Sequence, residues 1–271
     1  MLPMVNNETV LRIPVAFMEV VGRHFLSFIH VVGGISMLAI HTVRVLFSYK
    51  LEWREVLRQF VVIGNKSFSI VFLISFFTGL VIALQLSVGL GRFGLTLYVG
   101  QIVGLAIFRE LGPVLTALMI AARVGSGIAA ELGSMVVTEQ VLAIEAMGAH
   151  PIQKLVVPRV LVTLIATPLL TVMADIVGVI GGMLITVEEA GVTPRFYIDQ
   201  VSNTLLMDDF VSGIIKAAFF GFFISIIACY QGLNTRGGTE GVGRQTTKAV
   251  VYSSITIFVS DFFLTKLILY F

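Results

Sequence analysis

The residues with the clearest chemical potential in this sequence are a base and an acid placed side by side in an apolar run. The stretch Ile107–Met135 reads IFRELGPVLTALMIAARVGSGIAAELGSM, so Arg109 and Glu110 come just before Gly112 and Pro113. Charges inside an apolar segment are costly and usually face a partner or a polar cavity. Two interpretations therefore stand: the two side chains neutralise each other at a helix end, or they line a polar patch in a substrate path.

Three more ionisable residues lie inside apolar segments, namely Asp175, Lys216 and Asp261. Each is a candidate for an intramembrane polar site, although an ion pair of Lys216 with either aspartate explains them equally well. An ion-coupled secondary transporter would use Asp175 or Asp261 as a proton or sodium carrier, and this class remains the alternative to the function inferred below.

Catalytic chemistry is not indicated by any residue pattern. An enzyme acting on lipid phosphates needs clustered acids or paired histidines, and neither pattern occurs. The phosphate-binding pattern G-x-x-x-x-G-K-[ST] is also absent. We therefore expect no catalytic residue, metal or cofactor in this chain, and we expect any ATP hydrolysis to take place on a separate subunit.

The composition is that of an all-α integral membrane protein. Hydrophobic residues make up 57% of the 271 residues and charged residues only 13%, whereas a soluble domain carries about 25% charged residues. The net charge of +2 is spread along the chain, so nucleic acid is not expected as a partner. Five apolar segments are long enough to cross a bilayer of about 30 Å: Phe68–Leu90, Tyr98–Arg123, Val160–Val187, Phe210–Leu233 and Ala249–Phe271.

We expect the spans to form a single domain over residues 1–271. The asymmetric distribution of charge predicts how these spans are oriented in the membrane. Basic residues gather before the first span and in alternate connections, while the opposite side holds five acids. The positive-inside rule then places the N-terminus in the cytoplasm. Polar residues at Arg23, His30, His41, Arg44 and Ser48 form one stripe. This pattern favours an interfacial amphipathic helix over about residues 15–50 rather than a sixth span.

A short acidic segment follows Arg123. No Lys or Arg occurs over residues 124–153, where the acids are Glu131, Glu139 and Glu145. Thr138 is expected to cap a helix that Gly148 stops. The sequence thus predicts a cytoplasmic helix over about residues 130–148, which is either an ordinary loop helix or a docking element for a cytoplasmic protein.

Small residues and helix breakers predict local packing around this segment. Pro113 should kink a helix or start one, and the glycine-rich stretch Gly237–Gly243 is expected to be a flexible loop. Small residues recur at every fourth position, which allows close helix packing either within the chain or between two copies: Ala117, Ala121, Gly125, Ala129 and Gly133.

The sequence FRELGPVLTALMIAARVGSGIAAELGSMVVTEQVLAIEAMGAHP, followed by PRV, TPLLT and D-x-x-G-x-x-GG, resembles the MlaE/YrbE family of permease subunits. The resemblance covers nearly the whole chain. Members of this family belong to ABC systems that move phospholipids or other lipids with MCE-domain proteins in the bacterial inner (cytoplasmic) membrane.

The resemblance implies a homodimer with an ATPase subunit dimer on the cytoplasmic face and a ring of MCE domains on the other, with room for a small STAS-domain subunit. It implies that a coupling helix contacts the ATPase through Glu131, Glu139, Glu145 and Met147. It also implies a lipid path lined by Ile82, Gln85, Phe93, Arg109 and Glu110.

Overall fold

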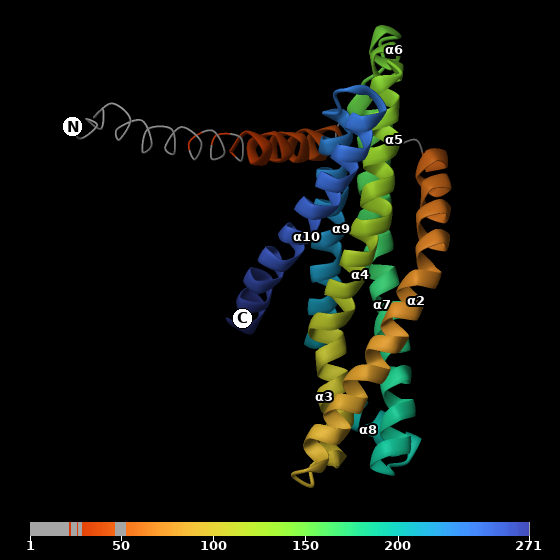
Figure 1. Cartoon of the computed structure of the whole chain (residues 1–271), viewed down its shortest axis with the longest axis vertical. Helices are drawn as coiled ribbons and strands as arrows, with labels where there is room; N and C mark the ends of the chain where they lie inside the picture. Colours follow the sequence, from red (N-terminus) through yellow and green to blue (C-terminus); the bar gives the residue numbers. More distant parts are fainter. Residues whose placement is uncertain (1–21, 23–25, 27–28, 47–52, 271) are drawn as a thin grey trace, which may run out of the picture.

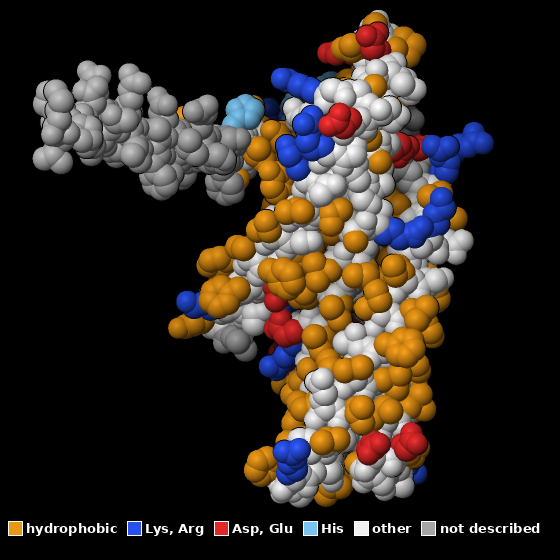
Figure 2. All heavy atoms as spheres, in the orientation of Figure 1, with side chains coloured by type: hydrophobic (Ala, Val, Ile, Leu, Met, Phe, Trp, Pro, Cys, Tyr) orange, Lys and Arg blue, Asp and Glu red, His pale blue; other side chains and the backbone are white. Residues whose placement is uncertain are grey.

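The structure is a computed structural model that describes residues 22, 26, 29–46 and 53–270. Within these residues every regular element is a helix, and the long helices run side by side along one axis (Figure 1). Figure 2 shows a largely apolar flank with charged side chains gathered toward both ends. The chain is therefore an all-α integral membrane protein that crosses the membrane several times.

Six of the described helices are long and apolar enough to cross a membrane, whereas the sequence predicted five spans. The additional helix is Ile29–Leu46, which lies crosswise to the others in Figure 1. The two counts differ because the length and hydropathy of a helix do not show how that helix is oriented relative to a membrane. The crosswise direction suits the predicted interfacial helix, whose depth in a membrane stays a prediction.

The crosswise helix is fixed by its contact with the bundle. A Cβ atom at Gly34 would come within 2.5 Å of the Tyr230 ring, so a larger residue here would require the tyrosine side chain to move. The predicted polar residues His30, His41 and Arg44 are exposed. The other two members of that stripe, at positions 23 and 48, lie outside the described residues.

The five other long helices contain the predicted spans but reach beyond them, because a helix need not end at the membrane surface. Continuous helical segments run over Thr96–Val137 and Ile152–Ala190. The remaining long helices are α2 (Trp53–Gly91), α9 (Met207–Leu233) and α10 (Gly238–Tyr270). A short helix, α8 (Pro194–Thr204), lies at the end of the bundle opposite to α6 (Figure 1).

The expectation of a flexible loop at Gly237–Gly243 is wrong. The backbone φ angles are 90° at Gly237 and 66° at Gly238, which makes the sharp turn that glycine allows. From Gly238 onward the same residues form the first turns of α10. The glycines therefore turn the chain and then enter a helix.

The second long segment is divided by two π-helical turns. It consists of α3 (Val99–Ala106), η2 (Ile107–Leu111), α4 (Gly112–Ile120), η3 (Ala121–Gly125) and α5 (Ser126–Val137). A short 3-10 turn, η1 (Thr96–Tyr98), precedes α3. Pro113 lies in the first turn of α4, directly after the π turn η2 and inside the continuous helical segment.

The bounds predicted for the acidic helix are wrong. α5 continues to Val137, and α6 (Gln140–Ala146) is a separate helix at the tip of the bundle (Figure 1). Thr138 does not cap α6, since its hydroxyl donates to the Ser134 carbonyl at 2.9 Å, in the preceding turn. The break lies at Glu139, whose φ is 61°.

Close helix packing holds the bundle together. α7 (Val157–Ala190), preceded by η4 (Ile152–Val156), lies against α2, where a Cβ on Gly79 would collide with the Gly178 carbonyl. Small residues allow such contacts in lipid, where apolar surface alone gives little preference for protein over lipid. The small-residue ridge also packs within the chain, because Gly125 faces Ile224. The structure therefore supports the intrachain interpretation of that ridge.

Candidate functional site

Five ionisable side chains meet partway along the bundle, and we call them the charge network. Arg109 and Glu110 come from the π turn η2, Asp209 and Lys216 from α9, and Asp261 from α10. η2 is far from α9 and α10 in sequence, so the network forms only when these three elements pack together.

Arg109 is paired with Asp209. The Arg109 Nε donates to Asp209 Oδ1 at 2.6 Å, and Nη2 lies 2.5 Å from the same oxygen. The second oxygen of Asp209 accepts the Leu206 backbone N–H at 3.0 Å, which caps the first turn of α9. The interpretation in which Arg109 and Glu110 neutralise each other is therefore wrong, because each finds a partner on α9.

Glu110 is paired with Lys216, whose ammonium is the centre of the network. The Lys216 Nζ lies 2.9 Å from Glu110 Oε2 and 3.2 Å from Asp261 Oδ1. It also donates to the Thr265 hydroxyl at 2.7 Å, and that hydroxyl lies 3.2 Å from Glu110 Oε1. One buried cation thus joins two carboxylates and a hydroxyl across three elements.

Pro113 accounts for the remaining bond of this ammonium. In an α-helix the N–H of residue 113 would bond to the carbonyl four residues earlier, and proline has no N–H. That carbonyl belongs to Arg109, and Lys216 Nζ donates to it at 2.9 Å. The helix breaker in the opening motif therefore leaves a backbone acceptor that a side chain of α9 can bind.

The network has a buried side and an open side. The side chains of Lys216 and Asp209 are 2% and 6% exposed, while those of Arg109 and Glu110 are 42% and 40% exposed. Figure 2 shows acidic and basic side chains together on the otherwise apolar flank beside the inclined α10. The network therefore presents a donor group and an acceptor group at an apolar surface.

Asp175 stands apart from the network. It is buried on α7, its Oδ1 has no hydrogen-bond partner, and a Cβ at Gly112 would collide with that oxygen. Of the two ion pairs considered for Lys216, the structure thus forms the one with Asp261.

The three remaining residues predicted for the lipid path lie elsewhere. Ile82 packs against the buried cluster of Ala83, Val103 and Ile107. Gln85 is exposed on α2, and Phe93 is 77% exposed in the turn after α2. Within the described part of the chain, none of the three joins the charge network, and their role in a path stays a prediction.

The residues predicted to contact an ATPase fall into two groups. Glu139, Glu145 and Met147 are exposed at the tip around α6, together with Leu142. Glu131 lies on α5 instead, and its Oε2 is 3.0 Å from Arg159 Nη2. The tip therefore combines apolar and acidic side chains, and Glu131 belongs to a different environment.

Asp209 and Thr265 were not predicted from the sequence as members of the network. Asp209 was counted only among the acids that set the orientation. A usable signal was present, since an arginine in an apolar segment usually faces a partner and Asp209 lies in the first turn of another apolar helix, α9. No comparable signal marks Thr265.

Comparisons with known proteins agree with this architecture. The family model for the permease MlaE matches residues 56–267. A probable ABC transporter permease protein of Rickettsia typhi is 39% identical over 250 residues, which cover 92% of this chain and 96% of that protein. The intermembrane phospholipid transport system permease protein MlaE of Haemophilus influenzae is 31% identical over 254 residues, which cover 93% and 97%. The chloroplastic protein TRIGALACTOSYLDIACYLGLYCEROL 1 of Arabidopsis thaliana is 38% identical over 217 residues, which cover 80% and 62%.

Proposed function

The chain belongs to the MlaE permease family of ABC transporter permeases, and from that premise we propose that it moves phospholipid, or a related lipid, between the bacterial inner membrane and a periplasmic MCE-domain carrier. It does so as a homodimer driven by a separate ATPase subunit dimer on the cytoplasmic face. The name of the Haemophilus influenzae relative, which states intermembrane phospholipid transport, supports the choice of substrate.

The charge network is the observation that carries this proposal. A phospholipid needs apolar walls for its acyl chains and a few polar groups for its headgroup. The half-exposed Arg109 guanidinium offers donors to phosphate oxygens. The half-exposed Glu110 carboxylate accepts from a headgroup hydroxyl or ammonium. Both groups are held in place by the buried partners Asp209 and Lys216.

The helix that carries the network also leads to the proposed ATPase contact. η2, α4, η3 and α5 form one continuous segment that ends beside α6 (Figure 1). π-helical turns often mark functional sites and places where a helix bends. Movement of α6 by the ATPase would therefore reach the network through a helix with two deformable turns.

The tip gives a test of this coupling. Charge reversal by Glu139→Lys together with Glu145→Lys should weaken copurification of the ATPase subunit by about tenfold, since acidic contacts would become repulsive. The matched control is Glu188→Lys with Glu189→Lys, because those acids lie at the far end of α7. An equal loss of ATPase copurification in both double variants would show that α6 is not the docking element.

Transport itself is tested with the complex in vesicles. The chain reconstituted alone should hydrolyse no ATP, and with its ATPase and MCE-domain partners it should transfer labelled phospholipid only when ATP is supplied. A proton or sodium gradient without ATP should give no transfer. Transfer driven by a gradient alone would favour the ion-coupled alternative and overturn the proposal.

A further inference from the structure

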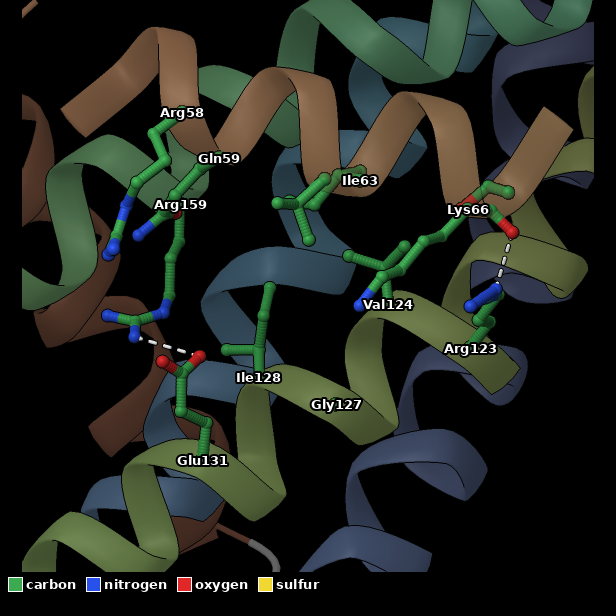
Figure 3. Close-up of a pocket in the computed structure, with 12 residues that line it drawn as sticks. Arg58, Gln59, Ile63, Lys66, Arg123, Val124, Gly127, Ile128, Glu131 and Arg159 are labelled. Atoms are coloured by element: carbon green, nitrogen blue, oxygen red, sulfur yellow. Dashed lines mark hydrogen bonds and ion pairs between the residues drawn. The ribbon is translucent and has the colours of Figure 1, made fainter. Parts of the chain in front are cut away.

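A polar cavity lies between α2, η3, α5 and α7, near the end of the bundle that carries α6. Its volume is about 370 Å³ (Figure 3). Four basic side chains line it, with one acid. These residues are Arg58, Lys66, Arg123, Arg159 and Glu131. We call this cavity the basic pocket.

The charges of the basic pocket do not balance within the chain. Glu131 is paired with Arg159 at 3.0 Å, and Glu55 is paired with Arg58 at 2.8 Å. Among the described residues no carboxylate pairs with Lys66 or Arg123. Arg123 donates instead to the Lys66 backbone carbonyl at 2.5 Å, which joins η3 to α2. Two exposed cations, Lys66 and Arg123, therefore line one cavity without a carboxylate partner in the described chain.

The positions of these cations suit an anion between the helices. In Figure 3 the Lys66 side chain extends from α2 toward Val124. The Arg123 guanidinium lies beside the backbone carbonyl of Lys66. Arg159, at the other end of the pocket, has a side chain only 5% exposed and is fixed by the Leu155 carbonyl at 2.5 Å. A phosphate group has several acceptor oxygens and can therefore accept hydrogen bonds from donors on more than one helix.

Two uncharged residues that line the pocket also carry buried polar atoms without hydrogen-bond partners. The Ser67 hydroxyl is buried without a hydrogen bond, although buried polar groups are nearly always bonded. Gln59 donates its amide nitrogen to Glu55 at 3.0 Å, which leaves its Oε1 buried and without a partner. The pocket thus offers an additional donor for a phosphate oxygen and an acceptor for a hydroxyl or ammonium.

The surroundings favour a lipid as the source of the phosphate. Val62 lines the pocket and is 46% exposed, and Phe68 and Phe72 on the same helix are 49% and 43% exposed. Acyl chains could lie along this apolar face while the headgroup enters the pocket. A soluble phosphate ester would gain nothing from these exposed side chains.

We propose that the basic pocket binds the phosphate of a membrane phospholipid headgroup, at a site separate from the charge network. Lys66, Arg123 and Ser67 contact the phosphate, and Gln59 accepts from the headgroup substituent. A bound lipid would join α2 to α5 just before α6. This assignment does not depend on the transport path, because it rests on different residues.

The test uses the purified full chain in mixed micelles, with phosphatidylglycerol as the probe. Lys66→Gln removes a cation that bears no carboxylate partner, and it should weaken phosphatidylglycerol binding by about tenfold, the effect of one lost charged hydrogen bond. Ser67→Ala should weaken binding about threefold. Arg54→Gln is the matched control: it removes one charge from an exposed position of α2 outside the pocket, and it should leave binding unchanged.

The outcomes separate the possible ligands. Diacylglycerol, which has no phosphate, should not compete with phosphatidylglycerol for binding. Glycerol 3-phosphate should compete with it only at a far higher concentration than a phospholipid does. An equal loss of phosphatidylglycerol binding in Lys66→Gln and Arg54→Gln would show that the lipid is attracted only by surface charge, and it would overturn the proposed site. Competition by diacylglycerol would reduce the pocket to an apolar contact. Equal competition by glycerol 3-phosphate would make the ligand a soluble phosphate ester and overturn the lipid assignment.

Discussion

The charge network and the basic pocket use ionisable residues in opposite ways. In the network two bases meet three acids, and both bases have carboxylate partners within 3.2 Å. In the pocket four bases meet one lining acid, and two of the bases have no carboxylate partner in the described chain. Paired charges can be kept at membrane depth without a ligand, whereas cations at a cavity without a carboxylate partner are available to bind an anion. The same residue types therefore carry different information according to how they are paired.

The largest expected effect comes from removing the central cation of the network. Lys216→Met leaves Glu110 and Asp261 without their shared partner, and breaking a buried pair in this way costs about 3–5 kcal/mol. We expect a clear drop in the thermal unfolding temperature of the purified chain and in its yield from membranes. Lys266→Met, at an exposed position of the same helix as Asp261, is the control. Equal shifts in the two variants would refute a central role for Lys216.

A charge swap sharpens the description of the network. Glu110→Lys combined with Lys216→Glu keeps one ion pair but places a carboxylate beside Asp261 and the Arg109 carbonyl. Repulsion there should keep lipid transfer at least about tenfold below the unmodified complex, measured per inserted protein. Full recovery of transfer would mean that Glu110 and Lys216 act as an isolated pair and that the other contacts are incidental.

A smaller effect is expected in the basic pocket from Arg159→Met. Arg159 is buried, but its partner Glu131 has a side chain 62% exposed and can be solvated by water once the arginine is gone. The free energy of unfolding should therefore fall by about 1–2 kcal/mol, clearly less than for Lys216→Met. The two variants measured by the same denaturation assay check this order. A larger loss in Arg159→Met would contradict the distinction between the two regions.

The helices were predictable because long apolar runs have few alternatives in lipid. Their ends were not, because α2 begins at Trp53 and α10 at Gly238, well outside the apolar runs. Backbone hydrogen bonding continues past the membrane surface wherever the residues allow it, and composition does not mark that limit. The crosswise direction of Ile29–Leu46 likewise depends on the fit of Gly34 against Tyr230, a contact far apart in sequence.

Most members of the candidate site were predictable from the sequence, but their pairing was not. Arg109, Glu110, Lys216 and Asp261 were singled out because charges in apolar runs are costly. Their partners depend on how η2, α9 and α10 face one another, so Asp209 and Thr265 were missed. The basic pocket was missed altogether, since Arg58, Lys66 and Arg159 were read only as signals of orientation and Arg123 only as the end of a span. Sequence shows which charges need partners, and packing decides which ones obtain them.

The most direct test of the central claim, that the charge network is the polar part of the lipid path, is photo-crosslinking within the complete transporter. A benzoylphenylalanine replacing Phe262, which is exposed and adjacent to Asp261, should capture phospholipid in an amount that changes several-fold when ATP is hydrolysed. Glu110→Gln should abolish that ATP dependence. The same probe at Leu169, an exposed position of α7, should capture bilayer lipid equally with and without ATP. If capture at position 262 is as insensitive to ATP and to Glu110→Gln as capture at position 169, the charge network lies outside the transport path.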